Sequence, residues 1–168
     1  INIITNTKLE KVEDGYCYFS NGTKINHSFV IFTGGVEAST ITAELEDVEK
    51  NGRGQIVVNE YMQTDKYENI FAIGDIAAML SEQNPKGHPM MAQPAIQQGK
   101  WLGENIIRKI NKQALKPFVY HDKGSMATIG RNKAVVDLPK FHFHGVFAWF
   151  VWIFVHLFSL IGFKNKAV

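Results

Sequence analysis

Residues 64–77 read Thr-Asp-Lys-Tyr-Glu-Asn-Ile-Phe-Ala-Ile-Gly-Asp-Ile-Ala, and this stretch decides the fold class. Its polar first half favours a turn, and residues 70–73 are a short apolar run typical of a strand buried on both faces of an α/β sheet. The run stops at Gly74 and Asp75, and open sheets bind ligands at such strand ends. A glycine there permits close approach of a cofactor, and the carboxylate can accept hydrogen bonds from sugar or polyol hydroxyl groups. The alternative is a plain turn and helix cap.

A second stretch, residues 88–99, reads His-Pro-Met-Met-Ala-Gln-Pro-Ala-Ile-Gln-Gln-Gly and begins a predicted helix over residues 92–110. Pro94 fits the first turn of this helix, and Asn111 is a plausible end. The expected apolar stripe comprises Ala95, Ile96, Trp101, Leu102, Ile106, Ile107 and Ile110. The start of such a helix presents free backbone N–H groups and the positive end of its dipole to whatever lies before Ala92.

A third stretch, residues 122–131, reads Asp-Lys-Gly-Ser-Met-Ala-Thr-Ile-Gly-Arg and belongs to a predicted β hairpin or small antiparallel sheet. Its strands are expected at residues 118–120, 126–129 and 134–136, with Lys123 in a turn. Near the N-terminus, residues 16–19 and 23–25 flank Asn21-Gly22, a tight-turn signal, and residues 29–32 resemble a buried strand. Residues 36–50 have a weakly helical pattern, and residues 55–59 form a further expected strand.

Taken in this order, the three stretches resemble the C-terminal part of type II NADH dehydrogenases, over about residues 29–163. These are single-subunit, FAD-dependent NADH:quinone oxidoreductases of the two-dinucleotide-binding-domain flavoprotein superfamily. The first motif is widespread in the superfamily, whereas the second and third are far more specific. The resemblance implies an α/β fold: a C-terminal fragment of a Rossmann-like FAD/NAD(P)-binding flavoprotein, with a small antiparallel β region and an amphipathic or apolar C-terminal membrane-anchoring helix.

The resemblance also implies roles for individual residues. FAD would be bound by Gly74, Asp75, Met91, Ala92, Gln93 and Lys123, and quinone by Gln93, Ile96 and Gln97. Gln93 and Gln97 are four residues apart and therefore share one helix face, from which their amides can donate to quinone carbonyl oxygens. Ordinary helix surface is the alternative for these amides, and a solvated turn is the alternative for Lys123.

Three regions are expected: residues 1–35 as the last strands of the NADH-binding domain, 36–116 as the returning part of the FAD-binding domain, and 117–168 as the hairpin and membrane anchor. The chain has no Gly-x-Gly-x-x-Gly loop, although the resemblance implies one for FAD and one for NADH. Both loops are expected upstream of Ile1, so the chain is interpreted as part of a longer protein and as inactive by itself.

Residues 145–163 contain no Asp, Glu, Lys or Arg and approach the roughly 20 residues that cross a bilayer. Aromatic residues spread through this run favour a segment that lies on the membrane surface. The expected anchor residues are Phe147, Trp149, Phe150, Trp152, Phe154 and Phe158. A buried core helix or a dimer interface is the alternative. His142, His144 and His156 lack accompanying carboxylates or cysteines, so no metal site is expected.

Composition adds limits of its own. A net charge of +2 over 168 residues gives no nucleic-acid signature, and the single cysteine, Cys17, excludes an internal disulfide. The sequence therefore predicts part of an NADH:quinone oxidoreductase at the cytoplasmic face of the cell membrane, with a membrane quinone as its partner and a homodimer as its assembly. The alternative function is a non-catalytic membrane-docking or dimerisation module on the same scaffold.

Overall fold

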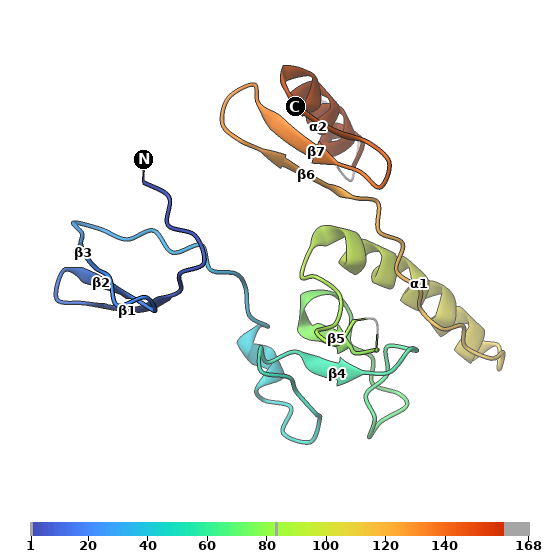
Figure 1. The fold of residues 1–168 in the computed structure, drawn as a ribbon. Helices are drawn as coiled ribbons and strands as arrows, with labels where there is room; N and C mark the ends of the chain where they lie inside the picture. Colours follow the sequence, from blue (N-terminus) through green and yellow to red (C-terminus); the bar gives the residue numbers. More distant parts are fainter. Residues whose placement is uncertain (1, 83, 160–168) are drawn as a thin grey trace. The chain divides into compact units, whose positions relative to one another are not determined.

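The computed structural model describes residues 2–82 and 84–159, and Figure 1 shows the elements in chain order. The chain divides into two units, Ile1–Val36 and Glu37–Val168. This division lies next to the boundary expected after residue 35. The assignment of the units to cofactor domains stays a prediction.

The first unit is a three-stranded antiparallel meander, β1 (Leu9–Glu13), β2 (Tyr16–Phe19) and β3 (Lys24–Asn26). The predicted tight turn at Asn21-Gly22 is confirmed, because it joins β2 to β3 and Gly22 has a φ of +78°, a left-handed conformation that glycine adopts without strain. Cys17 is buried on the central strand, opposite Ile25.

The buried strand expected at residues 29–32 is not formed. No strand is assigned there, and Phe29, Ile31 and Phe32 are 76%, 78% and 75% exposed. A strand needs at least one neighbouring strand to pair with, and no described residue pairs with this run.

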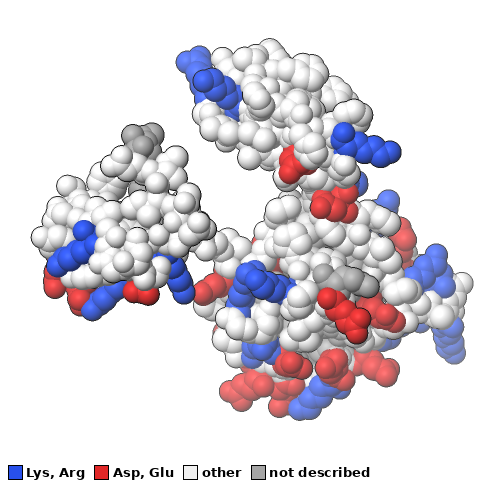
Figure 2. Space-filling model, in the orientation of Figure 1, with Lys and Arg blue, Asp and Glu red and all other residues white. Residues whose placement is uncertain are grey.

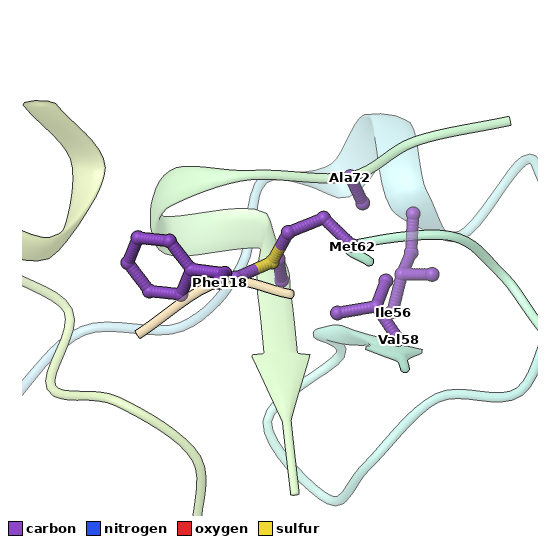
Figure 3. Close-up of a cluster of buried hydrophobic side chains, with 6 residues drawn as sticks. Ile56, Val58, Met62, Ala72 and Phe118 are labelled. Carbon is purple, nitrogen blue, oxygen red and sulfur yellow. The ribbon is translucent and has the colours of Figure 1, made fainter. Parts of the chain in front are cut away.

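The second unit contains a parallel pair of strands, β4 (Ile56–Val58) and β5 (Ala77–Met79), in register from Ile56 opposite Ala77. A buried apolar cluster packs around this pair, and Figure 3 shows the side chain of Met62 among its neighbours. The cluster comprises Ile56, Val58, Met62, Ala72, Ala77 and Phe118. The strand predicted at residues 55–59 is therefore confirmed over its central part.

The prediction of a strand at residues 70–73 is wrong, because the structure forms no strand there. The stretch is held to residues 62–64 by an isolated bridge between Gln63 and Phe71 and by a hydrogen bond from the Ala72 N–H to the Met62 carbonyl, 3.0 Å. These few bonds replace a sheet ladder, and the parallel strand begins only after η2 (Gly74–Ile76), a short 3₁₀ helix. Burial was nevertheless expected correctly for Ala72, which is 2% exposed.

The weakly helical pattern of residues 36–50 yields only η1 (Thr40–Thr42), a 3₁₀ turn. The Thr42 hydroxyl donates to the carbonyl oxygens of Ser39 and Gly54, at 2.9 and 2.8 Å. Such side-chain bonds to the backbone compete with helix formation. Exposed Ile41 and Leu45 show that no apolar face is buried to stabilise a longer helix here.

Helix α1 spans Ala92–Ile110, the predicted bounds, with Pro94 buried in its first turn and Asn111 as its C-cap. Its apolar stripe lies differently from the expectation. Most of the stripe faces outward, since Ile96, Ile106, Ile107 and Ile110 are 66%, 44%, 61% and 74% exposed. The buried face instead carries two amides, Gln98 and Asn105, beside half-buried Trp101.

The C-terminal part is an antiparallel sheet, β6 (Ser125–Thr128), β7 (Ala134–Asp137) and β8 (His142–Gly145), covered by helix α2 (Val146–Ser159). The strands predicted at residues 126–129 and 134–136 are confirmed, whereas residues 118–120 form none. Phe118 is a core residue whose N–H donates to the Glu60 carbonyl, 2.8 Å. β8 was not predicted, although half-buried Phe143 between exposed His142 and His144 is the alternation of a strand.

No helix in residues 2–82 and 84–159 is long and apolar enough to cross a membrane. The last residues of the apolar run, 160–163, lie outside the described part of the chain. The face of the C-terminal part visible in Figure 2 carries few charged side chains.

Candidate functional site

The turn η2 presents one carboxylate at the end of the apolar run. Gly74 has a φ of +70°, so a side chain at this position would be strained, and a Cβ there would lie 3.5 Å from the Ala95 Cβ. Asp75 is exposed, and its carboxylate accepts no hydrogen bond from the residues that the structure describes. A free carboxylate beside a glycine of this conformation fits the binding of a hydroxyl-bearing ligand.

The N-terminus of α1 lies against the same turn. Met91, the N-cap, is extended and gives no side-chain hydrogen bond to the helix end. Met91 and Ala92 are exposed, and among the described residues none accepts a hydrogen bond from the N–H groups of Ala92 and Gln93. Unsatisfied N–H groups at a helix N-terminus favour a ligand with electron-rich oxygen or nitrogen atoms. The contact of Gly74 with Ala95 places the turn and the helix start at one edge.

Residues 114–124 run back beside α1 and are called the returning segment. Gln93 and Gln97 form hydrogen bonds with the backbone of this segment. The Gln97 amide donates to the His121 carbonyl at 2.9 Å and accepts from the His121 N–H at 3.1 Å. The Gln93 amide donates to the Gly124 carbonyl at 2.7 Å and accepts from the Lys123 N–H at 3.3 Å. Each glutamine thus acts as a backbone-like partner for an extended chain, a role that the sequence analysis did not include.

Lys123 does not lie in a hairpin turn, which corrects the expectation. It is an exposed residue of the extended segment before β6, fixed by its own backbone bond to Gln93. The next residue, Gly124, has a φ of +86°, and a Cβ there would lie 2.3 Å from the Asp137 carbonyl oxygen. Only glycine fits this passage between α1 and β7, and it places Lys123 beside the first turn of the helix.

Further side chains of α1 continue the pairing along the helix. Trp101 Nε1 donates to the Pro117 carbonyl at 3.2 Å, and Arg108 Nε donates to the Ala114 carbonyl at 2.7 Å. Asn105 makes two bonds to the backbone of Lys116, accepting at 2.9 Å and donating at 3.2 Å. One face of α1 therefore holds the whole returning segment by directional bonds. The only sequence signal was the repetition of polar residues at four-residue spacing.

The quinone candidates are placed in two different environments. Gln93 and Gln97 are half-buried under the returning segment, whereas Ile96 is exposed on the outward face. Each side-chain amide has two N–H donors, and one of them is bonded to a carbonyl oxygen of that segment. One donor of each glutamine remains for a ligand.

Two titratable side chains, His88 and Tyr120, pack against each other in the second unit. The His88 ring packs on the rings of Phe118 and Tyr120, with centroids 5.7 and 5.1 Å away, and burial lowers the pKa of this imidazole. Burial also raises the pKa of the Tyr120 hydroxyl, and the Asp122 carboxylate raises it further by charge and by hydrogen bonding. A cavity of about 440 Å³ lies beside these residues; Pro89, Met91, Tyr120, Asp122, Leu138 and His142 contribute to its wall.

The six expected anchor residues fall on two faces of α2. Phe147, Phe150, Phe154 and Phe158 are 70%, 59%, 61% and 68% exposed. Trp149 and Trp152 are half-buried and pack on the β6–β8 sheet with Ala148. The two tryptophans are thus partly covered by protein while the four phenylalanines face outward, and the anchor role of all six residues stays a prediction. In the described part of the chain, no three His, Cys, Asp or Glu side chains cluster as metal ligands.

Comparison with known families covers most of the chain. Residues 1–99 match the family described as pyridine nucleotide-disulphide oxidoreductase, and residues 122–168 match the NDH2 C-terminal domain. The chain belongs to the pyridine nucleotide-disulphide oxidoreductase family. The C-terminal match places the chain in the type II NADH dehydrogenase branch of this family, as the sequence motifs indicated.

Relatives within the family have matching names. The type II NADH:quinone oxidoreductase of Mycobacterium tuberculosis is 36% identical over 155 residues, covering 88% of this chain and 32% of that protein. The type II NADH:quinone oxidoreductase of Haemophilus influenzae is 32% identical over 139 residues, covering 83% and 31%. The resemblance to type II NADH dehydrogenases is confirmed, and the chain spans about a third of the length of these relatives.

Solved structures support the fold. NDH2 from Plasmodium falciparum in complex with NADH superposes with a TM-score of 0.80 and 19% identity, over 99% of this chain and 49% of that chain. The sulfide:quinone oxidoreductase from Aquifex aeolicus gives a TM-score of 0.69 and 20% identity, over 98% and 42%. The expected flavoprotein fold is confirmed, with parallel and antiparallel sheets and helices.

Proposed function

We propose that this chain is the C-terminal part of an FAD-dependent NADH:quinone oxidoreductase. The observation that carries the proposal is the convergence of three segments at one edge. The turn at Gly74 contacts the first turn of α1, and the backbone of Lys123 is bonded to Gln93 in that same turn. The confirmed membership in the type II branch supports the assignment.

The residues at this edge fit a flavin dinucleotide. Asp75 offers a free acceptor for ribityl or ribose hydroxyl groups, and Gly74 leaves the approach open. Met91, Ala92 and Gln93 supply the helix end whose N–H groups favour an electron-rich ring edge, and Lys123 adds a cation. When bound, FAD supplies hydride acceptance from NADH and electron delivery to the quinone. The protein residues hold and orient it.

Gln93, Ile96 and Gln97 form one wall of the proposed quinone site. The remaining N–H of each glutamine is a neutral donor for a quinone carbonyl oxygen, and Ile96 adds exposed apolar surface. The return of the 121–124 segment onto these glutamines fixes the direction of both amides. Reduction of the quinone to quinol by NADH takes up one proton in addition to the hydride.

Partners of the whole protein follow from the exposed apolar surfaces. The outward isoleucines of α1 and the unpaired residues 29–32 are proposed to pack against parts of the whole protein that correspond to the rest of the longer relatives. Regions 1–35 and 36–116 are accordingly assigned to the NADH and FAD domains, and region 117–168 to the anchor.

The phenylalanine face of α2 is proposed to lie on the cytoplasmic surface of the cell membrane, where it would open the quinone site to lipid. A homodimer is proposed as the assembly. The exposure of the same phenylalanines also fits the alternative function, a docking or dimerisation module without electron transfer.

The test compares two aspartates in the full-length protein. Asp75→Ala removes the carboxylate at the proposed flavin edge, whereas Asp65→Ala removes an exposed carboxylate of the preceding turn. Loss of a hydrogen bond to a charged group weakens binding by about 1.5–3 kcal/mol, so FAD affinity and NADH:quinone turnover should fall more than about tenfold in Asp75→Ala only. Equal FAD retention and turnover in both variants would favour the docking module.

A further inference from the structure

Two buried glutamines of the second unit have no part in the proposed binding of FAD or quinone. Gln55 is 1% exposed and Gln98 is 2% exposed, at the start of β4 and on the inner face of α1. Buried amides are costly unless their donors and acceptors are paired. Both glutamines find partners in the same place, the backbone around Asp75.

Gln98 holds the residue before Asp75. Its Oε1 accepts a hydrogen bond from the Gly74 N–H at 2.6 Å. Gly74 has a positive φ and lies 3.5 Å, by its ideal Cβ position, from Ala95, one turn before Gln98 on α1. Gly74, the first residue of η2, is therefore tied to α1 by a hydrogen bond and a close contact.

Gln55 holds the residues at and after Asp75. Its Nε2 donates to the carbonyl oxygens of Asp75 and Ala77, at 3.2 and 3.0 Å. The orientation of this amide is set by a second one: Asn51 Oδ1 accepts from the N–H groups of Arg53 and Gln55, so its Nδ2 donates to Gln55 Oε1 at 2.9 Å. A flipped Gln55 amide would break this chain of bonds.

We propose that Gln55 and Gln98 are positioning residues for the Asp75 carboxylate. They bond the main chain on both sides of Asp75, one at the preceding N–H and one at its own carbonyl. The Asp75 side chain accepts no bond from the described residues, so the protein places this carboxylate through the backbone that the two glutamines hold. The inference rests on the proposed function, in which Asp75 binds hydroxyl groups of FAD.

The matched control is Asn105. It is a buried amide on the same face of α1, also 2% exposed, and it bonds the backbone of Lys116 instead of η2. Gln98→Met and Asn105→Leu each remove the hydrogen bonds of the side-chain amide and fill its place with an apolar side chain of similar size. Both variants should lower the melting temperature of the FAD-free protein, so stability alone does not distinguish them.

The experiment measures FAD dissociation constants of the full-length protein by quenching of flavin fluorescence. Misplacing Asp75 can cost binding at most the contribution of its own hydrogen bond, so Gln98→Met should raise the dissociation constant by up to about tenfold and Asn105→Leu by less than about twofold. Gln55→Met provides a second, independent variant with the same expectation should Gln98→Met not fold. Unchanged FAD affinity in the folded glutamine variant would overturn the inference.

A double-mutant cycle separates positioning from other effects. If Gln98 acts through Asp75, adding Gln98→Met to Asp75→Ala should change FAD affinity less than about twofold. A full tenfold further loss in that background would contradict the inference while leaving the proposed function intact. No effect of Asp75→Ala itself would instead contradict the role of Asp75 in the proposed function.

Discussion

The two helices attach to the molecule in opposite ways. α1 buries amides and bonds backbone atoms through Gln93, Gln97, Gln98 and Asn105, while its isoleucines face outward. α2 buries Ala148 and two tryptophans against a sheet, while its phenylalanines face outward. Directional bonds fix the positions of particular atoms, whereas apolar packing chiefly supplies adhesion. The proposed function uses this difference: α1 would place a ligand edge precisely, and α2 would attach the protein to a surface.

The strongest test of this difference substitutes outward apolar residues on both helices. Phe150→Ser with Phe154→Ser on α2 should weaken binding to vesicles of phosphatidylcholine and phosphatidylglycerol at least about hundredfold, because burial of each phenylalanine contributes about 1.5–3 kcal/mol. Ile107→Ser with Ile110→Ser on α1 should leave vesicle binding unchanged, because protein is expected to cover that face. Sedimentation with vesicles measures both; equal losses would remove the distinction.

A second test weakens the amide pairing of α1. Asn105→Leu leaves the Lys116 backbone without its two partners, which should cost about 1–3 kcal/mol locally. Hydrogen exchange of residues 114–118 in the full-length protein should then accelerate about tenfold, while residues 121–124, which Gln93 and Gln97 hold, should keep their rate. Asn111→Leu is the control, because Asn111 is exposed and makes no side-chain bond to the described residues. Unchanged exchange in Asn105→Leu would show that packing, not hydrogen bonding, holds the segment.

The smallest expected effect concerns pH. Burial lowers the pKa of His88 below its ordinary value of 6.5, so the unfolded chain binds more protons than the folded one as pH falls through 6.5. The His88 contribution to stability is therefore present above pH 6.5 and decreases as pH falls from there toward the lowered pKa. His88→Phe should flatten this part of the profile of melting temperature against pH, and an identical profile in the variant would contradict the assignment.

The sequence predicted α1 better than any other element. Helical periodicity, Pro94 in the first turn and Asn111 at the end act locally, and local signals do not need the rest of the molecule. The strand predictions at residues 29–32 and 70–73 failed because a strand depends on partners, and an apolar run does not specify them.

The resemblance assigned several segments to one flavin site, and their roles there stay predictions. Gly74, the start of α1 and Lys123 were expected together, and the structure brings them together. Gln55 and Gln98 were missed because a buried amide and a solvated amide have the same letter in the sequence. The bonds that distinguish them, to Gly74 and Asp75, join residues about twenty positions apart.

The most direct test of the account is the visible absorption spectrum of the full-length protein, recorded without oxygen after loading with FAD and removal of free cofactor. The account predicts flavin bands that NADH bleaches and an added quinone restores. It also predicts that Asp75→Ala retains much less flavin. A protein that holds no flavin, or whose bleached flavin the quinone does not restore, would contradict the assignment of this chain to an NADH:quinone oxidoreductase.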